Sequence, residues 1–292
     1  NRQILLYCMH HIITDGWSMG IFFHELSALY DAFSAGKAPS LPELPIQYAD
    51  FAVWQRKQLA GKRLEQQRSY WKRQLADLPV LELLTDRPRP PIQTHRGAKQ
   101  SFTLSQSLSE SVKGLTHQEG VTPFMTLLAA FTVLLHRYTG QVDIPVGSPI
   151  ANRTQIEIEG LIGYFMNMLI LRADLMGNPS FRELLARIRK LALEAYDHQD
   201  MPLDERLLKD LQRERDLSRN PLFQIVFVFQ NAPTRQALQL SGLTVTSMKV
   251  PSKTAQVDLS LYMWESEKGL AGVFEYNTDL FDDSTIASMV TH

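Results

Sequence analysis

Short apolar runs alternate along this chain of 292 residues with longer segments whose apolar positions recur at helical spacing. Short apolar runs are typical of buried strands, whereas a helical period is typical of amphipathic helices. A chain in which the two periods alternate is expected to fold as neither a helical bundle nor a β-sandwich. We therefore expect an α/β fold of the α+β type, in which helices and a sheet form two layers.

Turn and cap residues set the expected boundaries of these elements. Strands are expected over residues 4–9, 99–104, 143–149, 167–174, 222–229, 257–264 and 269–276, and the last two form a hairpin. Helices are expected over residues 16–35, 47–60, 64–77, 122–138 and 180–196, the last one with caps at Asn178 and Ser180. One more helix is expected to begin at Ser107 or Ser109.

The length of the chain corresponds to about two lobes. The best candidate for a linker is the segment DRPRPP at residues 86–91, because stacked prolines favour extended and semi-rigid backbone. We therefore predict two lobes, residues 1–90 and residues 91–292.

Charge and cysteine content exclude several classes of function. Thirty Lys and Arg residues nearly balance 31 Asp and Glu residues, and no long basic run is present, so nucleic acid is not an expected partner. The longest uncharged stretch, Val121 to Leu135, is shorter than a membrane span. A single cysteine, Cys8, forms neither an internal disulfide nor a cysteine-rich metal site, which favours a reducing, cytoplasmic location.

The string HHIITDG at residues 10–16 is the strongest candidate for a site. Successive side chains of a strand point to opposite faces, so His10 and His11 are not expected to bind one metal ion together. We expect one imidazole to face a cleft, where it can accept a proton near neutral pH, while the other packs inward. Asp15 suits a structural carboxylate at the turn, and Gly16 leaves a backbone N–H that a reacting oxygen can approach.

Five motifs in order resemble those of the condensation domains of nonribosomal peptide synthetases, which are relatives of chloramphenicol acetyltransferase. They are HHIITDGWS at 10–18, YADFAVWQ at 48–55, IGYFMN at 162–167 with LR at 171–172, YDHQDMP at 196–202 and RDLSRNPLFQ at 215–224. The resemblance implies two chloramphenicol acetyltransferase-like lobes.

Members of this family carry a substantial segment before the histidine motif that this sequence does not contain. The resemblance therefore implies a fragment with a partial N-terminal lobe and a complete or nearly complete C-terminal lobe. The strand expected at residues 4–9 would then lose its neighbours and expose an apolar edge.

The resemblance implies that the domain forms an amide bond between an upstream acyl or peptidyl thioester and the amine of a downstream aminoacyl thioester. It implies a catalytic set of His11, His10 and Gly16, with His11 as a general base or as a group that positions the amine. Asp15 is implied to be structural and paired with an arginine, either Arg153 or one outside this sequence.

Asn167 and Asn220 are implied to contact substrate, although Asn220 can equally form a turn before a buried strand. Large aromatic side chains such as Trp54, Trp71 and Tyr48 are expected to be packing anchors rather than substrate contacts. His198 is expected only to cap and end a helix.

No metal or other cofactor of the domain itself is implied. The substrates would be carried on the 4′-phosphopantetheine arms of upstream and downstream peptidyl carrier domains, next to an adenylation domain. Three alternatives stay open: an epimerisation domain of the same fold, an acyltransferase that makes an ester, and a non-catalytic docking module. A heterocyclising domain is disfavoured because its branch resembles an Asp-rich form of the histidine motif.

Overall fold

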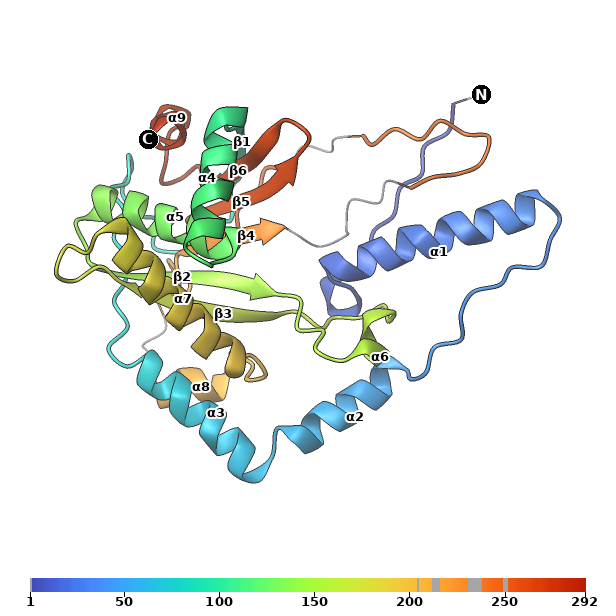
Figure 1. Cartoon of the computed structure of the whole chain (residues 1–292), viewed down its shortest axis with the longest axis horizontal. Helices are drawn as coiled ribbons and strands as arrows, with labels where there is room; N and C mark the ends of the chain where they lie inside the picture. Colours follow the sequence, from blue (N-terminus) through green and yellow to red (C-terminus); the bar gives the residue numbers. More distant parts are fainter. Residues whose placement is uncertain (1, 204, 212–215, 231–237, 249–251) are drawn as a thin grey trace. The chain divides into compact units, whose positions relative to one another are not determined.

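The computed structural model describes residues 2–203, 205–211, 216–230, 238–248 and 252–292 (Figure 1). Residue 215, the first of the motif at 215–224, lies outside the described residues. Contacts divide the chain into two compact units that alternate along the sequence. The first unit contains residues 1–64, 150–167 and 232–250, and the second contains residues 65–149, 168–231 and 251–292. The lobe boundary after residue 90 stays a prediction.

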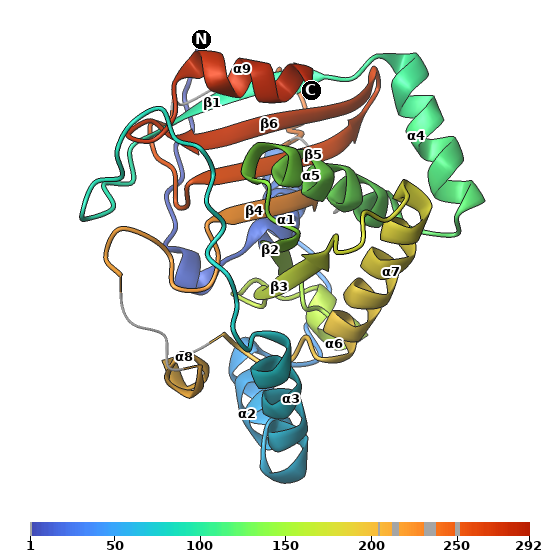
Figure 2. The ribbon, with the colours of Figure 1, turned by 90° about the vertical axis from the view of Figure 1, so that its left-hand side faces the viewer.

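In the part of the chain that the structure describes, a mixed sheet of six strands is the centre of the second unit, with the strand order β1-β6-β5-β4-β2-β3 (Figure 2). The strands are β1 (Gly97–Thr103), β2 (Asp143–Ile150), β3 (Asn167–Asp174), β4 (Ile225–Gln230), β5 (Leu259–Ser266) and β6 (Gly269–Asn277). β6 pairs antiparallel with both β1 and β5, whereas β4 pairs parallel with β5 and β2. The predicted hairpin of the last two strands is confirmed, and so is the mixed α and β architecture.

The second unit also contains several helices. They are α3 (Gly61–Gln74, from residue 65 on), α4 (Gln106–Gln118), α5 (Pro123–Thr139), α7 (Phe181–Asp197), α8 (Glu205–Asp210) and α9 (Asp283–Thr291). Apolar residues on one side of α5 pack on the sheet, since the ring of Phe131 lies 5.8 Å from that of Phe227 in β4 and 6.3 Å from that of Phe274 in β6.

Local capping explains where these helices begin. Ser180 caps α7 in a reciprocal box with Glu183, which confirms one of the two predicted cap residues, whereas Asn178 is not the N-cap. The predicted start of α4 at Ser107 or Ser109 is wrong, because Ser105 is the cap and its hydroxyl accepts a hydrogen bond from the N–H of Leu108.

The segment at residues 86–91 is fastened to the second unit. Asp86 donates its N–H to the carbonyl of Leu280, and Arg89 forms a bidentate ion pair with Asp258. This ion pair, through hydrogen bonds to the carboxylate, raises the pKa of Arg89 above its ordinary value, although burial opposes the change. The stacked prolines therefore run along the unit instead of forming a free linker.

The first unit holds α1 (Gly16–Ser34), α2 (Tyr48–Gln58), the short helix α6 (Ile156–Glu159) and the 3-10 turn η1 (His11–Ile13). Its small core brings Phe51 of α2 against Ile158, Leu161 and Phe165. The core thus joins segments that are more than a hundred residues apart in the sequence.

The strand predicted at residues 4–9 is wrong. Residues 2–10 form no ladder, and the side chains of Ile4, Leu5 and Leu6 are exposed. An extended apolar run becomes a strand only where a neighbouring strand supplies backbone hydrogen bonds, and the described residues place none beside it. The ring of Tyr7 instead lies 5.5 Å from that of Phe23 in α1.

Among the described residues, no single helix has both the length and the apolar composition for a membrane span. The pair α4 and α5 meets both criteria only jointly, across a bend of 111°.

Candidate active site

His11 lies in a tight turn that fixes its tautomer. Its Nδ1 is 2.6 Å from the carbonyl oxygen of Thr14. Because a carbonyl only accepts hydrogen bonds, Nδ1 carries the proton in the neutral imidazole, and Nε2 keeps its lone pair. His11 as a whole is exposed.

His10 caps the same turn, because its Nδ1 accepts a hydrogen bond of 3.0 Å from the N–H of Ile12. Both histidines are exposed. The prediction that one of them packs inward is wrong, since the backbone curls into a 3-10 turn at His11 and the alternation of a strand does not apply there.

Asp15 is buried, with 4% of its surface exposed, and caps the start of α1. Its Oδ1 accepts hydrogen bonds of 2.8 Å from both the N–H and the hydroxyl of Ser18, and its Oδ2 accepts one of 3.0 Å from the N–H of Phe165. Burial by itself raises the pKa of Asp15. These donors and the charge of Arg153 outweigh burial and leave the pKa below its ordinary value.

Arg153 is the cation beside this carboxylate. Its side chain is 1% exposed, and its Nη2 lies 3.3 Å from Oδ1 of Asp15 and 2.9 Å from the hydroxyl of Ser18. Its Nη1 donates to the carbonyls of Ile158 and Leu161. Burial lowers the pKa of Arg153, and the Asp15 carboxylate opposes that change.

Gly16 is the first residue of α1. The first N–H groups of an α-helix have no partner within the helix, so they can donate to an incoming negatively charged oxygen. A Cβ at Gly16 would meet no described atom within 4 Å, which leaves an open approach to this end of the helix.

Residues 163–165 form a loop whose backbone is held by three side chains of the first unit. The Ser18 hydroxyl lies 2.8 Å from the carbonyl oxygen of Gly163, to which it donates when its proton is not on Asp15, and it accepts from the N–H of Gly163 (3.1 Å). The Tyr48 hydroxyl donates to the carbonyl of Tyr164 (2.7 Å), and Asp15 accepts from Phe165. The pattern Asp-x-x-Ser at a helix start predicts the local hydrogen bond between Asp15 and Ser18, but nothing in the sequence indicates the contact of Ser18 with this distant loop.

The structure places the two predicted asparagines differently. Asn167 is half-buried at the start of β3. Asn220 belongs to the second unit, and its Oδ1 accepts hydrogen bonds from the N–H groups of Leu222 (3.0 Å) and Phe223 (3.3 Å). Asn220 therefore forms the turn before β4, and contact with substrate stays a prediction for both residues.

The roles expected for Trp71 and His198 agree with the structure. Trp71 is 0% exposed and donates to the carbonyl of His198, which confirms it as a packing anchor. His198 ends α7, with its Nδ1 2.8 Å from the carbonyl of Glu194. Trp54 and Tyr48 are partly exposed, yet each ring packs on that of Phe51, with centroids 5.9 Å and 6.1 Å apart.

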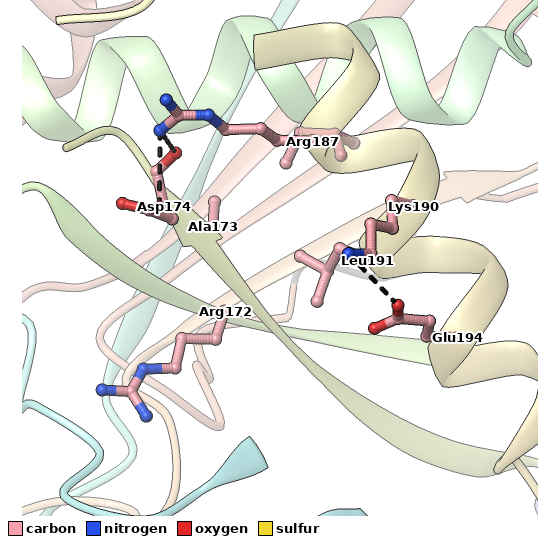
Figure 3. Close-up of a pocket in the computed structure, with 8 residues that line it drawn as sticks. Arg172, Ala173, Asp174, Arg187, Lys190, Leu191 and Glu194 are labelled. Carbon is pink, nitrogen blue, oxygen red and sulfur yellow. Dashed lines mark hydrogen bonds and ion pairs between the residues drawn. The ribbon is translucent and has the colours of Figure 1, made fainter. Parts of the chain in front are cut away.

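A groove of the second unit lies between β3 and α7 (Figure 3). Its charged side chains have partners: Arg187 lies 3.4 Å from the carboxylate of Asp174, and Lys190 lies 3.9 Å from that of Glu194. None of the predicted site residues lines it. Within the described part of the chain, no three His, Cys, Asp or Glu side chains converge as metal ligands.

Comparison with known proteins identifies the family. The family model described as Condensation domain matches residues 1–292. The chain is 52% identical over 295 residues to part of a linear gramicidin synthase polypeptide of Brevibacillus parabrevis. That match covers 100% of the chain but only 6% of the relative's length.

Solved structures agree with this match. The X-domain from teicoplanin biosynthesis, also solved in complex with OxyB, is 30% identical with a TM-score of 0.87, and the match covers 97% of this chain and 65% of that one. The first condensation domain of the calcium-dependent antibiotic synthetase is 22% identical with a TM-score of 0.76, over 97% of this chain and 62% of that one, which supports the fold alone.

Proposed function

The chain belongs to the condensation domain family, and from this premise we propose that it forms an amide bond between two carrier-bound substrates. The donor is an acyl or peptidyl thioester, and the acceptor is the amine of an aminoacyl thioester. One observation carries the proposal more than any other. The hydrogen bond from Nδ1 of His11 to Thr14 leaves Nε2 with a free lone pair on an exposed side chain, as a proton acceptor for the amine requires.

In the proposed reaction one bond forms and another breaks, and the proton released in the first step is used in the second. The amine nitrogen attacks the thioester carbon, and Nε2 of His11 takes the proton that the nitrogen loses. The C–N bond forms, a tetrahedral oxyanion develops, and the C–S bond then breaks. The leaving thiolate takes the proton back from the imidazolium, so that amide and free thiol are the products.

We assign supporting roles to the neighbours of His11. The N–H of Gly16 is the candidate donor to the oxyanion, where the positive end of α1 adds to its effect. His10 shapes the turn through Ile12. Asp15 and Arg153 hold α1 against the segment that follows β2, which supports a structural role for both.

The partners follow from the same proposal. Both substrates arrive on the 4′-phosphopantetheine arms of carrier domains, one upstream and one downstream, and an adenylation domain neighbours the condensation domain. We place the reaction in the cytoplasm, where an exposed thiol such as Cys8 stays reduced.

Mass spectrometry of the acceptor arm tests the reaction. Donor and acceptor are loaded on separate carrier proteins and mixed with the natural full-length protein or with its His11→Ala variant. We expect the acceptor to gain the donor's mass with the wild type only. A wild type that transfers nothing, or an alanine variant that transfers at the same rate, contradicts the proposal.

A docking module is the second candidate, because the chain is similar to an X-domain that was solved in complex with OxyB. The same experiment separates it from catalysis: a folded protein that binds carriers but forms no amide supports docking. Exchange of solvent deuterium into the α-carbon of a loaded residue supports epimerisation instead.

A further inference from the structure

We propose that Tyr164 is a positioning residue for His11, which holds the imidazole in the orientation that amide formation needs. The inference rests on the proposed function, and it assigns a role to a side chain outside the histidine motif. The two aromatic rings meet edge to face, with ring centroids 5.3 Å apart and an angle of 80° between their planes. This is a favoured geometry for a pair of aromatic rings.

The backbone around Tyr164 is held by hydrogen bonds to three side chains. Three consecutive residues, 163, 164 and 165, each have a backbone group bonded to a different side chain, from Ser18, Tyr48 and Asp15. Ser18 and Asp15 come from the same short segment as His11. The loop and the His11 turn are therefore held in a fixed position relative to each other. This also fixes the Tyr164 ring relative to the imidazole.

The side chain of Tyr164 is not used to fill the core. It is 39% exposed, whereas that of its neighbour Phe165 is 3% exposed and packs on Phe51, with 4.8 Å between ring centroids. The Tyr164 side chain is thus large and aromatic, lies partly outside the core, and places its ring against His11. This arrangement indicates a role at the site.

The packing around Gly163 shows how closely the loop fits. A Cβ at Gly163 would lie 2.3 Å from Cδ2 of Tyr48, which is too short for a contact between carbon atoms. Glycine at 163 thus lets the Tyr48 ring pass over the loop and reach the carbonyl of Tyr164. The same Tyr48 ring packs on Phe165 with 5.0 Å between centroids.

Two restraints together define the imidazole's orientation. The hydrogen bond to Thr14 fixes one ring nitrogen but leaves the ring able to tilt about that bond. The ring of Tyr164 limits this tilt. No carboxylate among the described residues is bonded to His11, so these two contacts do the work that an orienting carboxylate does in other sites.

Steady-state kinetics of amide formation test the inference in the full-length protein. Tyr164→Phe keeps the ring and is expected to hold kcat within about twofold of wild type. Tyr164→Ala removes the ring and should lower kcat about 2- to 10-fold, the range that an edge-to-face pair corresponds to, with KM for both loaded carriers unchanged. Ile162→Ala is the matched control, because Ile162 is equally exposed (38%) on the same segment, and it should behave as wild type.

Tyr48→Phe adds a second measure, since it removes only the hydrogen bond to the Tyr164 carbonyl. We expect a kcat between those of the wild type and Tyr164→Ala. Thermal melting of each variant separates positioning from folding. If Tyr164→Ala melts early, Tyr164→Leu, which keeps an apolar side chain without a ring, takes its place.

The outcomes are distinguishable. If the wild type forms amide and Tyr164→Ala forms it at the same rate, the inference is overturned and the proposed function stands. A Tyr164→Phe variant that is as slow as Tyr164→Ala has the same consequence. An effect on KM only also overturns it, because that result assigns Tyr164 to carrier or substrate binding. A wild type without any amide product overturns the proposed function and the inference together.

Discussion

Replacing Arg153 by methionine tests whether its buried pair with Asp15 holds the site together. Arg153→Met keeps most of the side-chain length but removes the charge and every donor. The Asp15 carboxylate, 4% exposed, then loses its cation, and the carbonyls of Ile158 and Leu161 lose a donor. Because removal of one partner of a buried pair costs about 3–5 kcal/mol, we expect the free energy of unfolding to fall by about that amount.

Urea unfolding of a double-mutant cycle is the assay, with Asp15→Asn, Arg153→Met and the double variant. If the two side chains interact directly, the double variant loses less than the sum of the single losses, by about 0.5–3 kcal/mol. Arg187→Met is the control, since its pair with Asp174 is largely exposed and should cost less than about 1 kcal/mol. Single losses that add within about 0.5 kcal/mol, or a loss at Arg153 no larger than at Arg187, would refute the reasoning.

Three other perturbations have expected outcomes. Gly16→Ala should leave the free energy of unfolding within about 0.5 kcal/mol of wild type, because a Cβ there meets no described atom within 4 Å. The variant should nevertheless form amide more slowly, because the added methyl group obstructs the approach of an oxygen to the N–H. An unchanged rate contradicts the oxyanion role. Ser18→Ala should lower the free energy of unfolding in urea by about 1–3 kcal/mol, because it strands the buried N–H of Gly163; a neutral result contradicts the assigned network. The pKa of Asp15 is lowered in the folded state, so the stability that its ionised form supplies is complete above the ordinary value of 3.8 and is lost as pH falls through the lower, folded pKa. Melting temperatures between about pH 5 and pH 2 should therefore fall more steeply for wild type than for Asp15→Asn; parallel curves refute this assignment.

Local signals explain why most elements of the second unit could be predicted. The apolar run of β3 and the turn between β5 and β6 depend on residues close in sequence, and the structure places both within two residues of expectation. The run at residues 4–9 has the same local signal but no neighbouring strand among the described residues. A strand needs a partner that its own sequence does not encode, so pattern alone overestimates strands of this kind.

The contacts of the site also separate into those between residues close in sequence and those between distant residues. The tautomer of His11 depends on Thr14, three residues away, and the motif already contains both residues. The ring against His11 comes from Tyr164, and the cation beside Asp15 comes from Arg153, so these contacts span about 140 to 150 residues. Sequence pattern carries no distance information at that range. Arg153 is a candidate only through the resemblance, and Tyr164 lies in the motif at 162–167 with nothing in its local pattern to indicate a contact with His11.

We expect stability and the proposed reaction to be coupled at this site, because the hydroxyl of Ser18 contacts Asp15, Arg153 and the 163–165 loop. The Ser18 hydroxyl accepts from Arg153 and from the N–H of Gly163, so its single proton goes either to Asp15 or to the carbonyl of Gly163. Removal of any member leaves a buried polar group of another without its partner. A loss of activity in Asp15 or Arg153 variants is therefore expected to follow from displacement of the His11 turn and the 163–165 loop. The exposed residues His11, Gly16 and Tyr164 lie outside this network, and for that reason their variants separate chemistry from folding.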